Sequence, residues 1–166
     1  MYRTIQDFLD DWKHENDATI KVFKNLTDSS LTHRITSENR SLGFLAWHIV
    51  LSLGEMGDKA GLQVAAPAED TPEPASAAAI VSFYEKAGTS FASEVKNKWN
   101  DGMLSEEIEM YGEKWTRGAT LAALSSHQIH HRAQMTVLMR QAGLKVPGIY
   151  GPSREEWSQM GMSAPK

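Results

Sequence analysis

Hydrophobic residues recur at helical spacing along four long segments of the chain. In the second segment, for example, Leu45, Ile49 and Leu53 fall on one face of a helix of 3.6 residues per turn. A stripe of this period is typical of an amphipathic helix that buries one face. The pattern predicts helices over about 4–26, 41–60, 74 or 75–99, and 116 or 118–142.

The positions of the prolines allow helices of this length. All six lie at 67, 72, 74, 147, 152 and 165, so residues 1–66 and 75–146 contain none. A proline inside a helix removes a backbone hydrogen bond and clashes with the preceding turn. Ser41 suits the start of the second helix, and Gly61 and Gly143 suit the ends of the second and fourth.

The segments between the helices have the composition of loops. Residues 27–40 are polar, a proline-rich stretch follows Gly61, and 100–115 is expected to be a loop with some extended character. A short helical segment is expected after Ser153. No stretch alternates convincingly as a strand would, so we predict an all-α four-helix bundle with a short C-terminal helical segment, in one domain spanning 1–166.

Composition and charge exclude several classes of function. The chain is 41% hydrophobic and 23% charged, which is ordinary for a globular protein, and its formal net charge is −4. No run of Lys or Arg offers a surface for nucleic-acid phosphates. The most apolar stretch, 44–54, is too short to cross a bilayer, and the acid-rich N-terminus does not resemble a secretory signal. We therefore expect a cytoplasmic protein without a nucleic-acid or membrane partner.

The chain contains no cysteine and six histidines. Disulfides, thiolate metal ligands and a cysteine nucleophile are thereby excluded. Any transition-metal site would have to be built from imidazoles and carboxylates.

Two histidines have the spacing of metal ligands. His127 and His131 differ by about 40° in direction and ~6 Å in rise on a helix, so both rings can reach one ion. His48, in the most apolar part of the second helix, is the best third ligand. His14 and His33 are expected at the surface, and His130 is rotated away from His127. The competing interpretation is that these are hydrogen-bonded core histidines, with the spacing arising by chance.

A few other side chains share the faces that carry these histidines. Gln134 follows His127 by seven residues and could orient a ligand, and Glu55 follows His48 by seven and could act as a base. Exposed helical side chains are the simpler interpretation of both. Trp47 and Trp115 could line a pocket, although packing is the more common role of tryptophan.

The sequence resembles the DinB/YfiT-like superfamily in four stretches. The resemblance is carried by LAWHI at 45–49, HQIHHRAQ at 127–134, LMRQAG at 138–143 and VPGIYGPS at 146–153. It is nearly continuous over 121–153, and the order of the helices extends it to almost the whole chain. The family usually has glycine where this chain has Ala133, a small residue that suits a helix.

The resemblance implies a bundle whose helices run up, down, down and up, with a divalent metal held by His48, His127 and His131. Members with known activity are thiol S-transferases, thiol-dependent isomerases or metal-dependent hydrolases that act on small-molecule substrates. A homodimer is expected from the resemblance alone.

Three histidine ligands leave an open coordination position, which is typical of catalytic metal sites. Together with the activities of the family that the chain resembles, this implies the transfer of a low-molecular-weight thiol to an electrophile, with zinc or nickel as the metal. No side chain is assigned as catalytic, because the reacting group would be a water or thiol on the metal; Gln134 and Glu55 are candidates for supporting roles. The alternatives are a metal-dependent hydrolase and a non-catalytic metal-binding stress-response protein. A pocket beside the histidines, lined by Trp47, Trp115 or Tyr150, would favour an enzyme.

Overall fold

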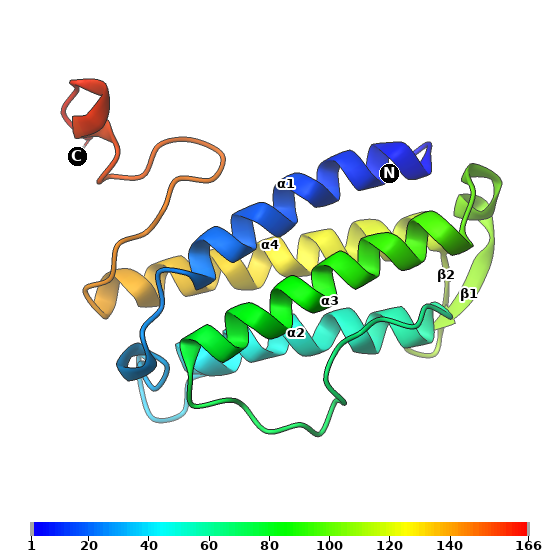
Figure 1. The fold of residues 1–166 in the computed structure, drawn as a ribbon, viewed down its shortest axis with the longest axis horizontal. Helices are drawn as coiled ribbons and strands as arrows, with labels where there is room; N and C mark the ends of the chain where they lie inside the picture. Colours follow the sequence, from blue (N-terminus) through cyan, green and yellow to red (C-terminus); the bar gives the residue numbers. More distant parts are fainter. Residues whose placement is uncertain (1, 166) are drawn as a thin grey trace.

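Four long helices form the body of the protein in the computed structural model, which describes residues 2–165 (Figure 1). Their bounds are α1 Ile5–Phe23, α2 Leu42–Lys59, α3 Ala77–Lys98 and α4 Arg117–Gln141. Helices α1 and α4 run in one direction and α2 and α3 in the other, with residues 60–76 returning along the length of the bundle (Figure 1). Each of α1 and α2 packs against both α3 and α4. The predicted four-helix bundle is confirmed.

Side-chain caps set where the helices begin. The hydroxyl of Ser41 accepts a hydrogen bond from the backbone N–H of Phe44, and Ser76 and Thr116 cap α3 and α4 in the same way. Thr4 and Asp7 form a reciprocal capping box at the start of α1. Because Ser76 caps α3, that helix begins at Ala77 and not at the predicted 74 or 75. Helix α1 ends at Phe23, three residues before the predicted end at 26.

A β-hairpin stands in the segment that was expected to be a loop with extended character. Strands β1 Glu107–Met110 and β2 Glu113–Thr116 pair antiparallel. A 3₁₀ turn, η2 Asp101–Ser105, precedes them, and a second one, η1 Asp28–Ser30, lies between α1 and α2. The hydrophobic pattern does not predict these strands, because each has four residues and Met110 is the one buried residue among the eight. The expectation that no strand is present is therefore wrong for these residues.

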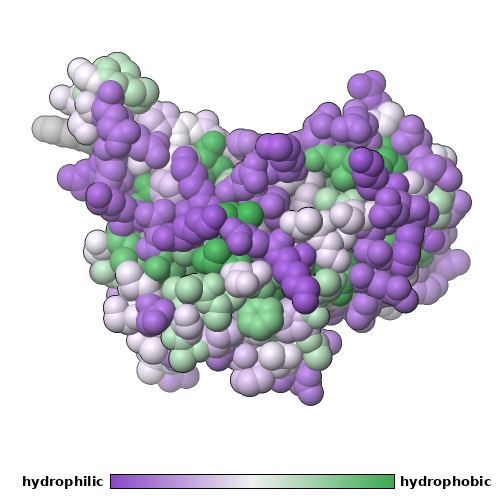
Figure 2. Space-filling model, viewed as in Figure 1, coloured by the Kyte–Doolittle hydropathy of each residue, from purple (hydrophilic) through white to green (hydrophobic). Residues whose placement is uncertain are grey.

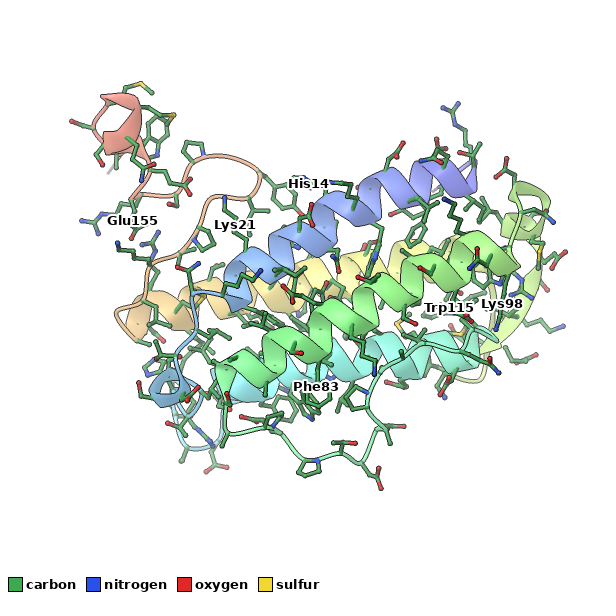
Figure 3. All side chains as sticks on the ribbon, viewed as in Figure 1. His14, Lys21, Phe83, Lys98, Trp115 and Glu155 are labelled. Atoms are coloured by element: carbon green, nitrogen blue, oxygen red, sulfur yellow. The ribbon has the colours of Figure 1, made fainter. Side chains whose placement is uncertain are left out.

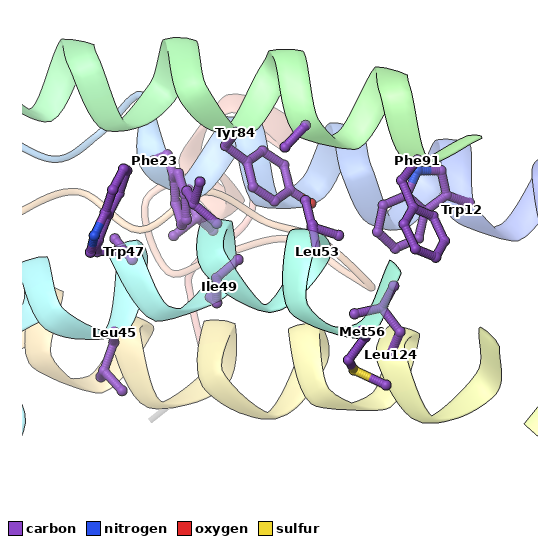
Figure 4. Packing of buried hydrophobic residues seen from close by; sticks show 14 of the residues in the cluster. Trp12, Phe23, Leu45, Trp47, Ile49, Leu53, Met56, Tyr84, Phe91 and Leu124 are labelled. Carbon is purple, nitrogen blue, oxygen red and sulfur yellow. The ribbon is translucent and has the colours of Figure 1, made fainter. Parts of the chain in front are cut away.

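Aromatic and aliphatic side chains from all four helices fill the core (Figure 4). The rings of Trp12 and Phe91 lie 5.4 Å apart across α1 and α3, and those of Phe23 and Tyr84 lie 5.1 Å apart. Burial of such a side chain contributes about 1.5–3 kcal/mol. Leu45 and Met56 of α2 and Leu124 of α4 belong to the same core, and α2 packs against α4, the pair of helices that carries the predicted site.

The chain beyond α4 lies over the outer face of α1 and ends in the 3₁₀ turn η3 Trp157–Met160, the predicted short helical segment (Figure 1). The ammonium of Lys21 donates a 2.9 Å hydrogen bond to the carbonyl of Gly148, and Figure 3 shows Lys21 of α1 beside this segment, which carries Glu155. Hydrophilic residues cover most of the face in Figure 2, with smaller hydrophobic areas between them. None of the described helices is long and apolar enough to cross a membrane.

Candidate metal centre

Three histidines from α2 and α4 meet at one point between the helices. The Nε2 atoms of His48 and His127 lie 3.1 Å apart. His131 completes the group, and one ring nitrogen from each residue lies within 4.8 Å of the others. Imidazole nitrogens bound about 2 Å from a zinc ion lie roughly 3.3 Å from one another. The cluster is therefore close to the size that one ion requires.

Burial keeps these imidazoles neutral. The pKa of His127 is lowered to about 4, first by burial and then by the charges that His131 and His48 carry when protonated. The pKa values of His48 and His131 are also lowered, again mainly by burial. Only a neutral imidazole has a lone pair to give to a metal. The three side chains are thus in the form that binds a cation at neutral pH.

The hydrogen bonds of the histidines fit a metal ion. Two neutral Nε2 atoms that face each other at 3.1 Å both present a lone pair when a cation lies between them. The Nδ1 of His127 is buried and has no hydrogen-bond partner within the described part of the chain. Each of the three residues thus keeps a ring nitrogen that no protein acceptor outside the cluster occupies, so the residues present fit a bound divalent ion.

Gln134 orients His131 from the same helix. The Nδ1–H of His131 donates a 2.8 Å hydrogen bond to the Oε1 of Gln134, because an amide oxygen can only accept. The amide nitrogen of Gln134 in turn donates to the Nε2 of His130 at 3.1 Å. These two hydrogen bonds direct the remaining ring nitrogen of His131 at the cluster. Such an arrangement is typical of a metal-ligating histidine.

A cavity of about 300 Å³ opens beside the cluster, beneath the β-hairpin. Its walls come from α2, the hairpin and α4: His48, Ser52, Glu55, Met56, Tyr111, Trp115, Ala123 and His127. Glu55 and Trp115 therefore lie where the sequence interpretation needed them. Trp47 does not, because its ring packs against Phe83 and its indole N–H donates to the carbonyl of Thr71. Tyr150 also lies elsewhere, against α1 and α4.

A second cavity, of about 340 Å³, lies toward the other end of the cluster. Asn39, Arg40 and Gln134 contribute its polar side chains, and the rest of its lining is aliphatic. The guanidinium of Arg40 stacks on the ring of Phe44 at 5.1 Å, and that ring stacks on His48. The charge of Arg40 also lowers the pKa of His127. The two cavities therefore differ in the charge of their lining: Arg40 lines one and Glu55 lines the other.

The other histidines do not join the cluster. His14 is exposed, as predicted, and its ring lies 5.8 Å from that of Tyr150. His33 is half-buried, and its Nε2 is enclosed without a partner among the described residues, so its predicted surface position is only partly correct. His130 is exposed and reaches the site only through Gln134.

Sequence reasoning missed two polar supports of the site. The amide nitrogen of Gln128 donates 3.2 Å hydrogen bonds to the carbonyl of Ile49 and the hydroxyl of Ser52, which ties α4 to α2 beside His48 and His127. Arg132, next to His131, forms a buried ion pair with Glu15 of α1. For Gln128, the available signal was a glutamine inside an apolar helix face. No signal in the sequence pointed to the ion pair between Arg132 and Glu15.

Comparisons with known proteins agree with this architecture. A protein of Bacillus subtilis named "Uncharacterized protein YrdA" is 48% identical over 166 residues, covering 100% of this chain and 99% of that protein. A crystal structure of a DinB-like protein from Bacillus cereus superposes with a TM-score of 0.87 at 41% identity, covering 90% of this chain and 100% of that one.

A more distant crystal structure, of the DinB-like protein YjoA from Bacillus subtilis, has a TM-score of 0.65 at 19% identity and covers 88% of this chain and 98% of its own. At that identity it shows a likeness of fold alone. The model of the DinB family matches residues 1–163. With the four-helix bundle and the three-histidine cluster in view, this match shows that the chain belongs to the DinB family.

Proposed function

We propose that this protein is a metal-dependent transferase that joins a low-molecular-weight thiol to an electrophile, with His48, His127 and His131 as the metal ligands. The observation that carries the proposal is a cavity lined by His48 and His127, two of the three convergent imidazoles. A structural metal ion would be enclosed by four protein ligands, whereas three ligands beside a cavity leave room for a substrate.

A bound divalent ion would supply a Lewis acid that lowers the pKa of a thiol or water entering the site. Imidazole donors suit zinc and nickel equally well, so both belong to the proposal. Gln134 holds His131 in the tautomer that leaves its second ring nitrogen for the ion.

The chain's own residues define the rest of the reaction. Because the sequence has no cysteine, the reacting sulfur must come from a small-molecule thiol. That thiol gives its proton to a base, its sulfur forms the new bond to an electrophilic carbon, and the leaving group departs with the electron pair. The base that takes this proton is water in the cavity, because Glu55, the one carboxylate among its described lining residues, lies two helical turns along α2 from His48.

The proposal is tested by screening zinc- and nickel-loaded protein with several cellular thiols and chlorodinitrobenzene, whose conjugation is followed by absorbance. We expect at least one thiol to react faster than it does without protein, and His127→Ala to remove this acceleration. His14→Ala is the matched control, because His14 is exposed and outside the cluster.

If no thiol reacts faster with the native protein than with His127→Ala, the transferase proposal is wrong. Hydrolysis of a chromogenic ester without thiol, lost in the same variant, would instead support the hydrolase alternative.

A further inference from the structure

We infer that the cavity beneath the β-hairpin binds the protonated amine of a small ligand, with Glu55 as the counter-ion and the rings of Tyr111 and Trp115 as its walls. This inference rests on the proposed function in one respect, namely that the reacting end of the ligand lies at the histidines. The binding of the amine itself depends only on the residues of the cavity.

The lining of this cavity is suited to a cation. Among the described residues that line it, Glu55 is the one acidic side chain, and none is a lysine or arginine. Beyond the two imidazoles, the remaining polar surface comes from a hydroxyl, a phenol and an indole. A carboxylate beside the faces of aromatic rings attracts an ammonium group through both charge and the ring quadrupole. At the end of the cavity away from the histidines, an anionic group would be repelled by Glu55.

The carboxylate of Glu55 is available for a ligand. Lys59 lies one helical turn further along α2, where an ion pair with Glu55 would be expected. The ammonium of Lys59 lies instead over the ring of Tyr111, 5.2 Å from its centroid. Within residues 2–165, Glu55 forms no salt bridge. The half-buried carboxylate therefore has no cationic partner, and its neighbour on the cavity wall is the phenol of Tyr111, whose pKa it helps to raise through a hydrogen bond.

The backbone conformation of the hairpin turn also supports a functional role for this cavity. Tyr111 and Gly112 form the two-residue connection, and both have positive φ angles, 54° and 82°. Asparagine or aspartate followed by glycine is the usual choice in such a turn. A tyrosine here is strained, and strain of this kind is found where a side chain has a functional task. Its consequence is a phenol ring placed on the wall of the cavity, 5.9 Å from Trp115.

The two hollows beside the cluster differ in the ligand that they can accept. The hollow on the far side is lined by Arg40 and contains no carboxylate among its described lining residues. Glu55 follows His48 by seven residues, which is about 10 Å along the helix axis. A ligand with its amine at Glu55 and its reacting group at the histidines therefore has several bonds between the two groups. An acidic group on a ligand would be directed toward Arg40.

The test is NMR titration of the full chain, both zinc-loaded and metal-free, with butylamine, butanol and butyrate as probes. In the metal-free protein, where no divalent ion can bind the carboxylate of butyrate, we expect butylamine to shift the indole N–H of Trp115 and the backbone N–H of Gly112 at concentrations where butyrate has no effect. Glu55→Gln should weaken butylamine binding by about tenfold. Glu109→Gln, an exposed residue of the same hairpin, is the matched control and should leave the affinity unchanged.

Equal binding of the three probes, or an unchanged butylamine affinity in a folded Glu55→Gln protein, would overturn the inference. If Glu55→Gln does not fold, loss of the preference for butylamine over butanol in Tyr111→Asn gives the second test, and retention of the preference would overturn the inference. The metal-free titration separates the two proposals. Selective binding of butylamine to metal-free protein would support the amine site even if the protein binds no metal. Its absence would overturn the amine site even if the protein does bind metal.

Discussion

The imidazoles of His48, His127 and His131 are neutral at a pH where an exposed histidine is partly protonated. Burial is the main cause for each of them, and the neighbouring rings add to it. A cation that enters the cluster therefore displaces no protons at neutral pH. The same burial makes the metal-free cluster sensitive to acid.

The stability of the metal-free protein is expected to fall as the pH drops below about 6.5, the pKa of an unperturbed histidine. The folded pKa of His127 is about 4, so between these values the unfolded chain binds more protons than the folded chain. Acid therefore favours unfolding, until the loss is complete near the folded pKa. Thermal unfolding of chelated protein at pH 7.5 and pH 5.5 measures the effect.

In His127→Ala the difference in Tm between these two pH values should be smaller than in the native chain. The exposed His14→Ala variant should behave like the native chain. An equal pH dependence in His127→Ala would contradict the assigned direction of the pKa shift.

At the scale of elements, the helices could be predicted because each carries an apolar stripe and a capping side chain. Leu45, Ile49 and Leu53, predicted as one stripe, are all buried in α2. The hairpin could not be predicted in the same way, since its turn is built on tyrosine and its strands are exposed. The alternation of Glu107–Met110 extends over only four residues, and the turn lacks the usual Asn-Gly or Asp-Gly pair.

Replacing the strained residue of this hairpin should separate stability from binding. We expect Tyr111→Asn to raise the free energy of unfolding by about 0.5–1 kcal/mol, because asparagine tolerates a φ of 54° better than tyrosine does. The same change removes a wall of the cavity beside Glu55 and should weaken butylamine binding. Urea unfolding and the titration described above measure the two effects.

Tyr111→Phe is the matched control, because it keeps the strained ring and should leave stability nearly unchanged. If Tyr111→Asn is less stable than Tyr111→Phe, the turn is not strained in the way described.

At the scale of the whole molecule, contacts between distant parts of the chain support the site. The guanidinium of Arg132, only 2% exposed, lies 2.5 Å from the carboxylate of Glu15, and it donates to the hydroxyl of Tyr150 at 2.7 Å. That hydroxyl donates to Glu15 at 2.8 Å. Helix α1, helix α4 and the C-terminal segment are joined there, one residue from His131.

This network marks the limit of what could be predicted. The histidine triad could be proposed because the spacing of His127 and His131 is local and His48 lies in an apolar face. The partners Glu15 and Arg132 are 117 positions apart, and each is an ordinary charged helical residue in the sequence. Their burial follows from the packing of α1 on α4, which no local pattern encodes.

Arg132→Met should destabilise the protein by about 3–5 kcal/mol, because it leaves the carboxylate of Glu15 buried without its cation. The double variant Glu15→Leu with Arg132→Met should lose less, since no uncompensated charge remains. Urea unfolding of the metal-free protein measures both. Lys13→Met is the control: it breaks an exposed ion pair with Asp17 and should cost less than about 1 kcal/mol. An Arg132→Met loss as small as that of the control would contradict the role given to the buried pair.

The central claim, that three histidines bind one divalent metal ion, is tested most directly by metal analysis of protein purified without a histidine tag. The account predicts about one zinc or nickel ion per chain after loading and dialysis, and loss of that ion in each of His48→Ala, His127→Ala and His131→Ala. His14→Ala should retain it. Full occupancy in any variant of the triad, or no bound metal in the native chain, would contradict the account.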